Sequence, residues 1–197
     1  MRGKAKLLTD KDINNCLRYI QTTKTKERTT AMFILMLTTA LRIHSIQKLT
    51  IGQVYDEHFK PRESFLIHPN QNKGGRKSLQ VYINDTLHKE LVSYMRYLQS
   101  KGHKITKEQY LFTSNKGSYL SKQQIIRIIT GVFNAVGLDS QYRCHSLRAT
   151  ALTRLMDANY PLALIQQISG HSSIQTLSIY YRSNPKNIKK ALETLSY

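Results

Sequence analysis

The sequence is poor in cysteine, proline and glycine, and each shortage narrows the class of protein. Cys16 and Cys144 are the only cysteines among 197 residues. Their spacing fits neither a zinc ribbon nor a disulfide framework, so we expect two free thiols in a reducing cytoplasm. Four prolines and nine glycines form no linker or low-complexity tract. This composition favours one continuous domain over residues 1–197.

Long apolar runs are also missing. The longest one, Ala31 to Leu41, is interrupted by Thr38 and Thr39 and is far too short to span a bilayer. No signal peptide or lipidation motif is recognisable. We therefore expect no membrane partner and a cytoplasmic location.

Negative charge is scarce as well. Twelve acidic residues face thirty lysines and arginines, which leaves a formal net charge of +18. This excess favours a polyanionic partner, because each neutralised phosphate releases condensed counterions. An anionic membrane would satisfy the charge too, but nucleic acid agrees better with the missing membrane signals. The sequence shows no carboxylate cluster of the two-metal kind and no nucleotide-binding loop, so we expect neither metal nor cofactor.

What is present is hydrophobic periodicity, which predicts a mainly α-helical fold with one small antiparallel β-sheet (α+β). Apolar residues make up 40% of the chain, enough for a packed core. Two strand-like runs at 64–68 and 78–83 flank a loop, 70–75, whose residues tolerate positive φ, which predicts a hairpin. Helices are predicted from apolar spacing and capping residues at about 10–20, 27–40, 85–98, 122–136, 145–158, 161–169, 172–181 and 185–195.

Two polar patterns in the C-terminal half point to chemistry. His145 and Arg148 lie three residues apart on a predicted helix, so both project from one face. His171 follows Gly170 at a predicted helix junction, from which a polar group can be aimed into a site. Tyr180 comes nine residues later. Each pattern alone also fits a surface histidine–arginine pair or a histidine that caps a helix.

Taken together, these patterns resemble the tyrosine recombinase (integrase) family. His-x-x-Arg, then Gly-His-Ser-Ser-Ile at 170–174, then Tyr180 is similar to the family's second conserved box. The segment 38–49 resembles the first box, with Arg42 as its arginine. Lys73, in the predicted hairpin turn, matches the family's lysine. Because these motifs occur in the family's order over nearly the whole chain, the resemblance implies the catalytic-domain fold of that family.

The resemblance implies a DNA-cleaving and DNA-rejoining enzyme with a 3′-phosphotyrosine intermediate. Two arginines would stabilise negative charge on the phosphate, and the tyrosine would attack it. The phosphotyrosine bond would keep the energy of the broken phosphodiester, so rejoining needs no ATP. The implied catalytic residues are Arg42, Lys73, His145, Arg148, His171 and Tyr180.

Each remaining group has an implied role. His145 would take the proton of Tyr180, Lys73 would protonate the leaving 5′-oxygen, and His171 would hydrogen-bond the phosphate. Tyr181 competes with Tyr180 for the role of nucleophile. Because adjacent side chains on a helix diverge by about 100°, only one of them can face the phosphate, and the family spacing selects Tyr180.

Double-stranded DNA is the partner that the resemblance implies, with the chain located at the nucleoid. We expect residues 183–197 to form a C-terminal helix that docks on a neighbouring subunit of a homo-tetramer on DNA; the alternative is that it packs on its own domain. No N-terminal core-binding domain is expected. Candidate phosphate contacts outside the catalytic group are Arg76, Lys77, Lys122 and Arg143.

Three positions depart from the family pattern. Ser45 stands where a carboxylate usually orients the neighbouring groups, Ala149 replaces a frequent histidine, and Ser169 replaces a frequent leucine. Site-specific recombination (integration, excision or inversion) is the expected function. A type IB topoisomerase that only relaxes DNA remains an alternative, as does a catalytically inactive DNA-binding regulator with the same fold.

Overall fold

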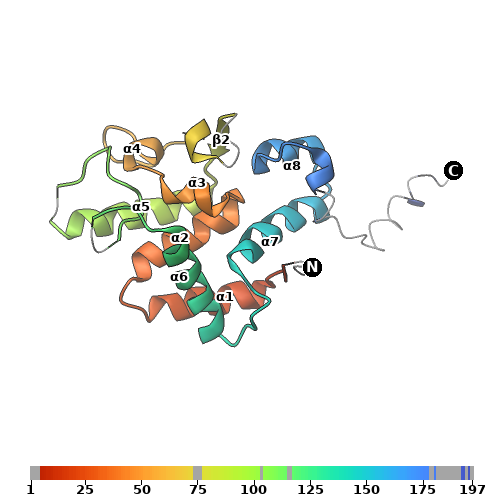
Figure 1. Cartoon of the computed structure of the whole chain (residues 1–197), viewed down its shortest axis with the longest axis horizontal. Helices are drawn as coiled ribbons and strands as arrows, with labels where there is room; N and C mark the ends of the chain where they lie inside the picture. Colours follow the sequence, from red (N-terminus) through yellow and green to blue (C-terminus); the bar gives the residue numbers. More distant parts are fainter. Residues whose placement is uncertain are drawn as a thin grey trace.

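The computed structural model describes residues 5–72, 77–102, 104–114, 117–177, 180, 192–193 and 195. Within these ranges the chain is mainly helical with one two-stranded antiparallel sheet, which confirms the predicted fold class (Figure 1). The α-helices are α1 (Asp10–Gln21), α2 (Lys26–Thr39), α3 (Ile43–Gln47), α4 (Ile51–Val54), α5 (Asp85–Ser100), α6 (Lys122–Ala135), α7 (Cys144–Asp157) and α8 (Leu162–Ser169). The strands are β1 (Ser64–Ile67) and β2 (Leu79–Tyr82), and the 3-10 helices are η1 (Pro69–Gln71) and η2 (Ile174–Leu177).

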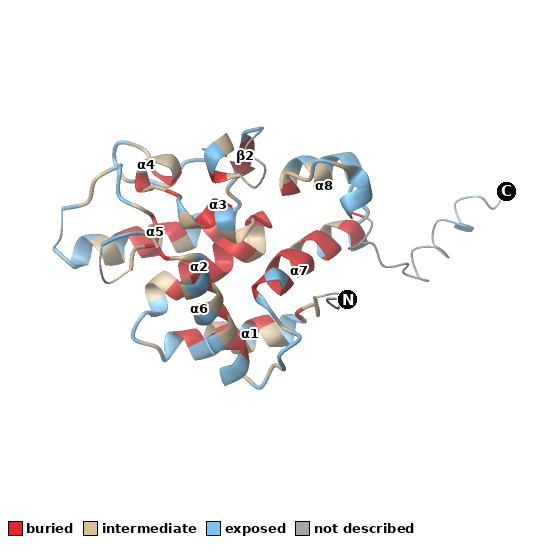
Figure 2. Cartoon of the chain, in the orientation of Figure 1, coloured by how far each residue is buried: buried red, intermediate tan, exposed pale blue. Residues whose placement is uncertain are grey.

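Helix α2 is the centre of the core. Its residues from Thr29 to Met36 are all buried, and it packs against α1, α5 and α7 (Figure 2). A helix that is apolar on all sides can be stable only when neighbours cover it all round. Helices α1 and α5 carry one apolar stripe each and pack against α2, whereas α7 is buried over most of its surface. The C-terminal end of α2 is thereby held rigidly in the middle of the molecule.

Local signals in the sequence explain where several helices begin. Thr9, Asn84 and Ser121 each accept a hydrogen bond from a backbone N–H in the first turn of α1, α5 and α6. These caps satisfy donors that have no partner inside the helix. Threonine, asparagine and serine are among the residue types that favour this position.

The hairpin lies beside α8. Strands β1 and β2 pair in antiparallel register, with Phe65 opposite Val81, and β2 packs against α8. Phe65, Ile67, Leu79 and Val81 face the core, while the alternate residues face outward. The turn predicted at 70–75 is described only up to Asn72, where it contains the 3-10 helix η1.

One predicted helix is wrong. The spacing at 172–181 predicts an α-helix, whereas the structure has a single 3-10 turn, η2, and Tyr180 in a turn whose N–H donates to Leu177 O at 2.9 Å. Ser173 accepts from Gln175 N through its side chain and from Thr176 through its carbonyl, and this local bonding competes with α-helical bonds. The helix predicted at 185–195 lies outside the described residues, apart from 192–193 and 195.

Both cysteines are free, as expected from their spacing, and both are buried. Burial raises the pKa of each thiol to about 12, so both stay protonated and act as small apolar side chains. No helix in the described part of the chain is long and apolar enough to cross a membrane.

A half-buried carboxyl on α5 sets a stability prediction. Burial, followed by the charge of Glu27, raises the pKa of Glu90 to about 7. In the unfolded chain this carboxyl has its ordinary pKa of 4.5. Folding disfavours its charged form, so the folded state loses stability as the pH rises from 4.5 through 7. We expect Glu90→Gln to raise the free energy of unfolding at pH 8 by up to about 1 kcal/mol after solvent screening.

Urea unfolding at pH 4 and pH 8 measures this effect. At pH 4 the wild-type carboxyl is protonated, so the gain should nearly disappear. Glu57→Gln, at an exposed position, is the matched control and should change stability little at either pH. An equal gain for Glu90→Gln at both values would contradict the assigned cause.

Candidate active site

The end of α2 delivers the first arginine of the site. Ala40 terminates the helix in the left-handed region, with φ at 52°, and is fully buried. This turn is costly for a residue with a Cβ, but it directs the chain into Arg42, the N-cap position of α3. The Arg42 side chain is half-buried and donates from Nη1 to Gly170 O at 3.2 Å.

Helix α7 supplies the second arginine and a histidine. Arg148 is only 2% exposed, and its guanidinium donates from Nη1 to Ala40 O and from Nη2 to Ser169 O at 2.9 Å. Its Nε–H is buried without a hydrogen-bond partner among the described residues. His145, one turn earlier on the same face, is exposed at the surface of the helix. The three-residue spacing thus brings both groups to one site.

The junction after α8 places the second histidine. Gly170 ends the helix in the left-handed region with φ at 62°. This backbone conformation favours glycine, and a Cβ here would lie 3.1 Å from Leu79 Cδ2, so the leucine side chain would have to shift slightly. His171 then turns back toward α7, and its Nε2 lies 3.1 Å from Arg148 Nη2.

Tyr180 is docked into the site of its own chain. Its side chain is 8% exposed and packs with Ala40, Leu152 and Ile165 in a small apolar cluster. Its hydroxyl lies 2.8 Å from His145 Nε2. The tyrosine ring centroid lies 5.9 Å from that of His145 and 5.8 Å from that of His171. The phenol therefore lies between two imidazoles and close to a buried arginine.

The electrostatics of this group favour an anion. Burial and the charge of Arg42 lower the pKa of Arg148 to about 10, so the guanidinium stays charged at neutral pH. Burial and both arginines lower the pKa of His171 to about 4. His145 remains accessible to solvent, but partial desolvation of its ring against Tyr180, followed by the charges of Arg148 and Arg42, lowers its pKa as well. Both imidazoles are therefore neutral at pH 7, and the site carries two positive charges.

Main-chain carbonyls orient the two arginines. Arg148 donates to the carbonyls of Ala40 and Ser169, and Arg42 donates to the carbonyl of Gly170. Neither guanidinium has a carboxylate partner within the described ranges. Ser45, noted above as a departure from the family pattern, is 1% exposed in α3. Carbonyls hold the guanidinium groups without neutralising them, which leaves their charge available to a bound phosphate.

Five of the six predicted catalytic residues come together. His145, Arg148, His171 and Tyr180 are linked by hydrogen bonds or ring contacts, and Arg42 joins them by donating to Gly170 O, the carbonyl next to His171. Arg42 precedes α3, His145 and Arg148 lie on α7, His171 follows α8, and Tyr180 follows η2. Lys73 lies outside the described residues, as does the predicted phosphate contact Arg76.

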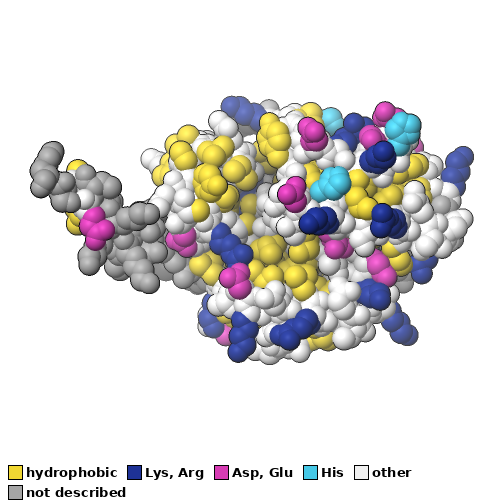
Figure 3. Space-filling model, turned by 180° about the vertical axis from the view of Figure 1, so that it is seen from behind, with side chains coloured by type: hydrophobic (Ala, Val, Ile, Leu, Met, Phe, Trp, Pro, Cys, Tyr) yellow, Lys and Arg dark blue, Asp and Glu magenta, His cyan; other side chains and the backbone are white. Residues whose placement is uncertain are grey.

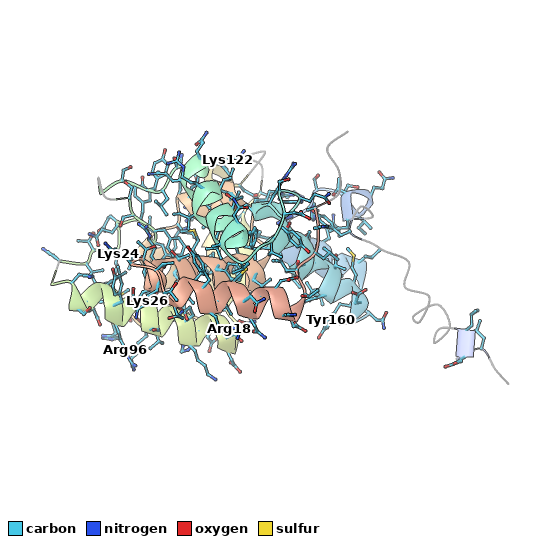
Figure 4. The ribbon with its side chains drawn as sticks, turned by 90° about the horizontal axis from the view of Figure 1, so that it is seen from below. Arg18, Lys24, Lys26, Arg96, Lys122 and Tyr160 are labelled. Carbon is cyan, nitrogen blue, oxygen red and sulfur yellow. The ribbon has the colours of Figure 1, made fainter. Side chains whose placement is uncertain are left out.

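The other predicted DNA contacts are exposed cations. Lys77 lines a groove of about 1120 Å³ formed by the end of α2, β2 and α8, and His171 lines the same groove. Arg143 is exposed at the N-cap of α7, and Lys122 is exposed at the start of α6. Figure 4 shows Lys122 on one side of the molecule and Arg18 and Arg96 on the other. Basic residues therefore occur on more than one face, and of the three only Lys77 shares a groove with a predicted catalytic residue.

Sequence patterns alone missed three contributors to the site. Ala40 and Gly170 act through their backbone carbonyl oxygens, and the residue type does not show which carbonyls will contact an arginine. Ser169 was noted only as a departure from the family pattern, yet its hydroxyl oxygen lies 2.6 Å from His171 Nδ1. A serine directly before Gly170 and His171, at a position where the family pattern has leucine, was the available signal.

Comparison with known proteins identifies the family. Residues 6–187 match the model of the phage integrase family. The chain is 26% identical to the tyrosine recombinase XerD of Rickettsia prowazekii over 195 residues, covering 94% of this chain and 61% of that protein. It is 31% identical to XerC of Corynebacterium glutamicum over 117 residues, covering 59% and 37%. The chain belongs to the phage integrase family, as its motifs predict, and it spans 37% to 61% of the length of these two relatives.

Solved structures confirm the tyrosine recombinase catalytic-domain fold. The XerA recombinase superposes with a TM-score of 0.74 at 21% identity, covering 98% of this chain and 64% of that one. XerH recombinase bound to its difH substrate gives 0.75 at 21% identity, covering 98% and 55%. The Tn1549 transposon integrase in complex with transposon right end DNA gives 0.74 at 20% identity, covering 98% and 66%.

Proposed function

We propose that this chain is the catalytic part of a site-specific DNA recombinase that cuts and rejoins strands through a 3′-phosphotyrosine. One observation carries the proposal: the Tyr180 hydroxyl lies 2.8 Å from a neutral imidazole, beside two arginines that no carboxylate within the described ranges neutralises. This is the arrangement that nucleophilic attack on a phosphodiester needs.

In the first step, the Tyr180 oxygen attacks the scissile phosphorus and forms the O–P bond. A phenol has an ordinary pKa near 10, so the proton must leave as the bond forms. His145 Nε2, already in hydrogen-bond contact with the hydroxyl, accepts this proton because the lowered pKa keeps its ring neutral. The other product is a DNA strand with a 5′-oxygen that requires a proton.

The cations supply the remaining stabilisation. Arg42 and Arg148 donate to the non-bridging oxygens, where negative charge grows in the transition state. His171, which lies 3.1 Å from Arg148 Nη2, supports this guanidinium beside the phosphate. Lys73 protonates the leaving 5′-oxygen in this scheme. Rejoining reverses the sequence, with a 5′-hydroxyl of the partner strand displacing the tyrosine.

Double-stranded DNA is the proposed substrate, and this partner places the chain at the nucleoid in the cytoplasm. Support comes from the net charge of +18 and from Lys77 in the groove that also contains His171. The XerH and Tn1549 integrase structures hold DNA. Phosphate contacts from Lys77, Lys122 and Arg143 should strengthen binding without selecting sequence.

The function is tested by trapping the covalent intermediate. We use a library of DNA duplexes with randomised cores, each with a nick beside the candidate site. Cleavage then releases a short fragment, and the loss of this fragment prevents rejoining. We expect SDS-resistant protein–DNA adducts whose sequences converge on one core. Paired copies of that core should then yield recombinant products. Relaxation of supercoiled plasmid without recombinants would indicate a topoisomerase, and a protein that binds but never forms an adduct would indicate an inactive regulator.

The proton-accepting role of His145 predicts the acid limb of the pH–rate profile. Since burial and the two arginines lower its pKa below the ordinary value of 6.5, the ring should stay neutral at pH 6.5. We expect single-turnover adduct formation to decline only below pH 6.5, as the imidazole gains a proton. In His145→Gln the rate should be lower at neutral pH, by about 10²-fold or more, and this limb should disappear. An acid limb of the same shape in the variant would contradict the assignment.

Assembly through the C-terminal segment is the remaining part of the proposal. Leu192 and Leu195 are 61% and 64% exposed, so their apolar side chains are not buried against their own domain. Figure 3 shows further hydrophobic side chains at the surface around α8, where Tyr160, Leu162 and Leu164 are exposed. Such surfaces fit docking between subunits of a tetramer. Truncation after Arg182 should abolish higher-order assembly on DNA in size-exclusion and footprinting experiments; unchanged assembly would contradict this part.

A further inference from the structure

Ser169 contacts two groups of the site at once. It is the last residue of α8 and is 1% exposed. Its carbonyl oxygen accepts from Arg148 Nη2 at 2.9 Å, and its Oγ lies 2.6 Å from His171 Nδ1 and 3.3 Å from Gln166 O. A buried hydroxyl at such a position must satisfy its own donor and acceptor.

The chemistry of the neighbours fixes the direction of these hydrogen bonds. A guanidinium can only donate, and both ring nitrogens of His171 lie within reach of Arg148 Nη2, Nε2 at 3.1 Å and Nδ1 at 3.4 Å. The Ser169 hydroxyl decides between them: it donates to Gln166 O, so its oxygen is left to accept from Nδ1, and Nε2 is the nitrogen that accepts from Arg148. A neutral imidazole that accepts at Nε2 carries its proton on Nδ1. That N–H points to Ser169 Oγ, and the serine proton is left for the carbonyl of Gln166. Each donor in this series of hydrogen bonds then has one acceptor.

We propose that Ser169 is a positioning residue that holds His171 in the Nδ1–H tautomer and thereby seats its ring against Arg148. The inference rests on the proposed function, because it assigns a task within the same site. Family members with leucine at this position have no hydroxyl to offer. In this chain the serine side chain therefore sets which nitrogen of His171 accepts from the Arg148 guanidinium.

Histidine tautomers are measured directly by nitrogen NMR. With ¹⁵N-histidine label in the full chain, the seven ring systems give long-range ¹H–¹⁵N patterns that distinguish the two neutral forms, and His171→Gln identifies the relevant signals. We expect the wild-type His171 ring at pH 7 to be Nδ1-protonated. Ser169→Ala should shift it toward the Nε2–H form or a mixture. A wild-type ring protonated at Nε2, or a tautomer unchanged in Ser169→Ala, would overturn the proposal.

Kinetics give a second readout. Ser169→Ala should slow the first-order step of adduct formation about 5- to 10-fold, the effect of losing one hydrogen bond, with DNA affinity unchanged. In a His171→Ala background the same substitution should have no further effect, because Ser169 acts through that ring. Ser169→Thr, which keeps the hydroxyl, should recover the rate. Equal slowing in both backgrounds would show that the serine acts by another route.

Ser100→Ala is the matched control. Ser100 also ends a helix, and its hydroxyl donates to the carbonyl three residues earlier, Tyr97 O, at 2.8 Å, but it is exposed. The control should leave both the His171 tautomer and the cleavage rate unchanged. If the wild-type chain forms no covalent adduct at all, the proposed function fails, whereas the NMR result still decides the role of Ser169.

Discussion

Tyr180→Phe is expected to abolish formation of the covalent protein–DNA adduct, with a loss of at least about 10⁴-fold. The substitution removes the oxygen that forms the phosphotyrosine bond and leaves the ring. Because the ring is held by Ala40, Leu152 and Ile165, the site should keep its shape. Adducts are counted on denaturing gels with the trapping substrate, and DNA binding is measured in parallel. Binding should stay within about twofold of wild type, since a single hydrogen bond of the free protein is lost.

Tyr181→Phe is the matched control for this result. It makes the same chemical change at the adjacent residue, and adduct formation should persist. Tyr160→Phe, at a half-exposed position in the turn before α8, serves as a second control. Adducts that survive in Tyr180→Phe and vanish in Tyr181→Phe would transfer the nucleophile to the neighbour. Adducts that survive in both would refute phosphotyrosine chemistry at this turn.

Arg148→Lys is expected to produce the second large effect. The planar guanidinium of Arg148 donates to Ala40 O and Ser169 O together. Lysine keeps the positive charge but has a single ammonium group in place of this planar set of donors. We expect the single-turnover cleavage rate to fall by about 10²- to 10³-fold, the cost of one preorganised donor lost from a transition state. The protein should also lose stability by about 1–3 kcal/mol, since one buried carbonyl is left without its donor.

Arg154→Lys separates the site from the helix that carries it. Arg154 lies on the same helix, α7, is exposed, and pairs with Asp10 at the surface. Its replacement should change the free energy of unfolding by no more than about 0.5 kcal/mol and leave cleavage unaffected. Cleavage at the wild-type rate in Arg148→Lys, measured on protein shown to be folded by thermal unfolding, would remove Arg148 from the proposed mechanism.

Much of the architecture follows from periodicity and capping residues. The apolar stripe behind Thr9 predicts α1, and the run around Phe33, apolar on most sides, predicts a buried helix; the structure has both. Alternating residues on both sides of a turn-rich loop predict the hairpin, and the observed register puts Phe65 opposite Val81. These features depend on nearby residues, so the sequence records them directly.

The error at 172–181 has a local cause. Apolar spacing there resembles a helix, but Ser173 offers competing hydrogen bonds, so a 3-10 turn forms in place of an α-helix. This turn brings Tyr180 back to His145. The tyrosine selected by the motif spacing therefore lies beside His145 even though the predicted secondary structure was wrong. Lys73 and the tail at 183–191 stay predictions, since they fall outside the described residues.

The sequence by itself determined the charge of the chain, its helices and its hairpin, and the list of residues whose chemistry suits a phosphodiester. Only the tertiary structure decided how those residues are held. Arg148 and Ala40, whose carbonyl it contacts, lie 108 residues apart in the chain. Every residue has a backbone carbonyl, so the residue type does not show which one will contact an arginine. The carbonyls that contact the two arginines lie at the ends of α2 and α8, and the hydroxyl beside His171 lies at the end of α8. Their positions relative to the site therefore depend on how α2, α7 and α8 are arranged in space. Packing of the core sets those positions.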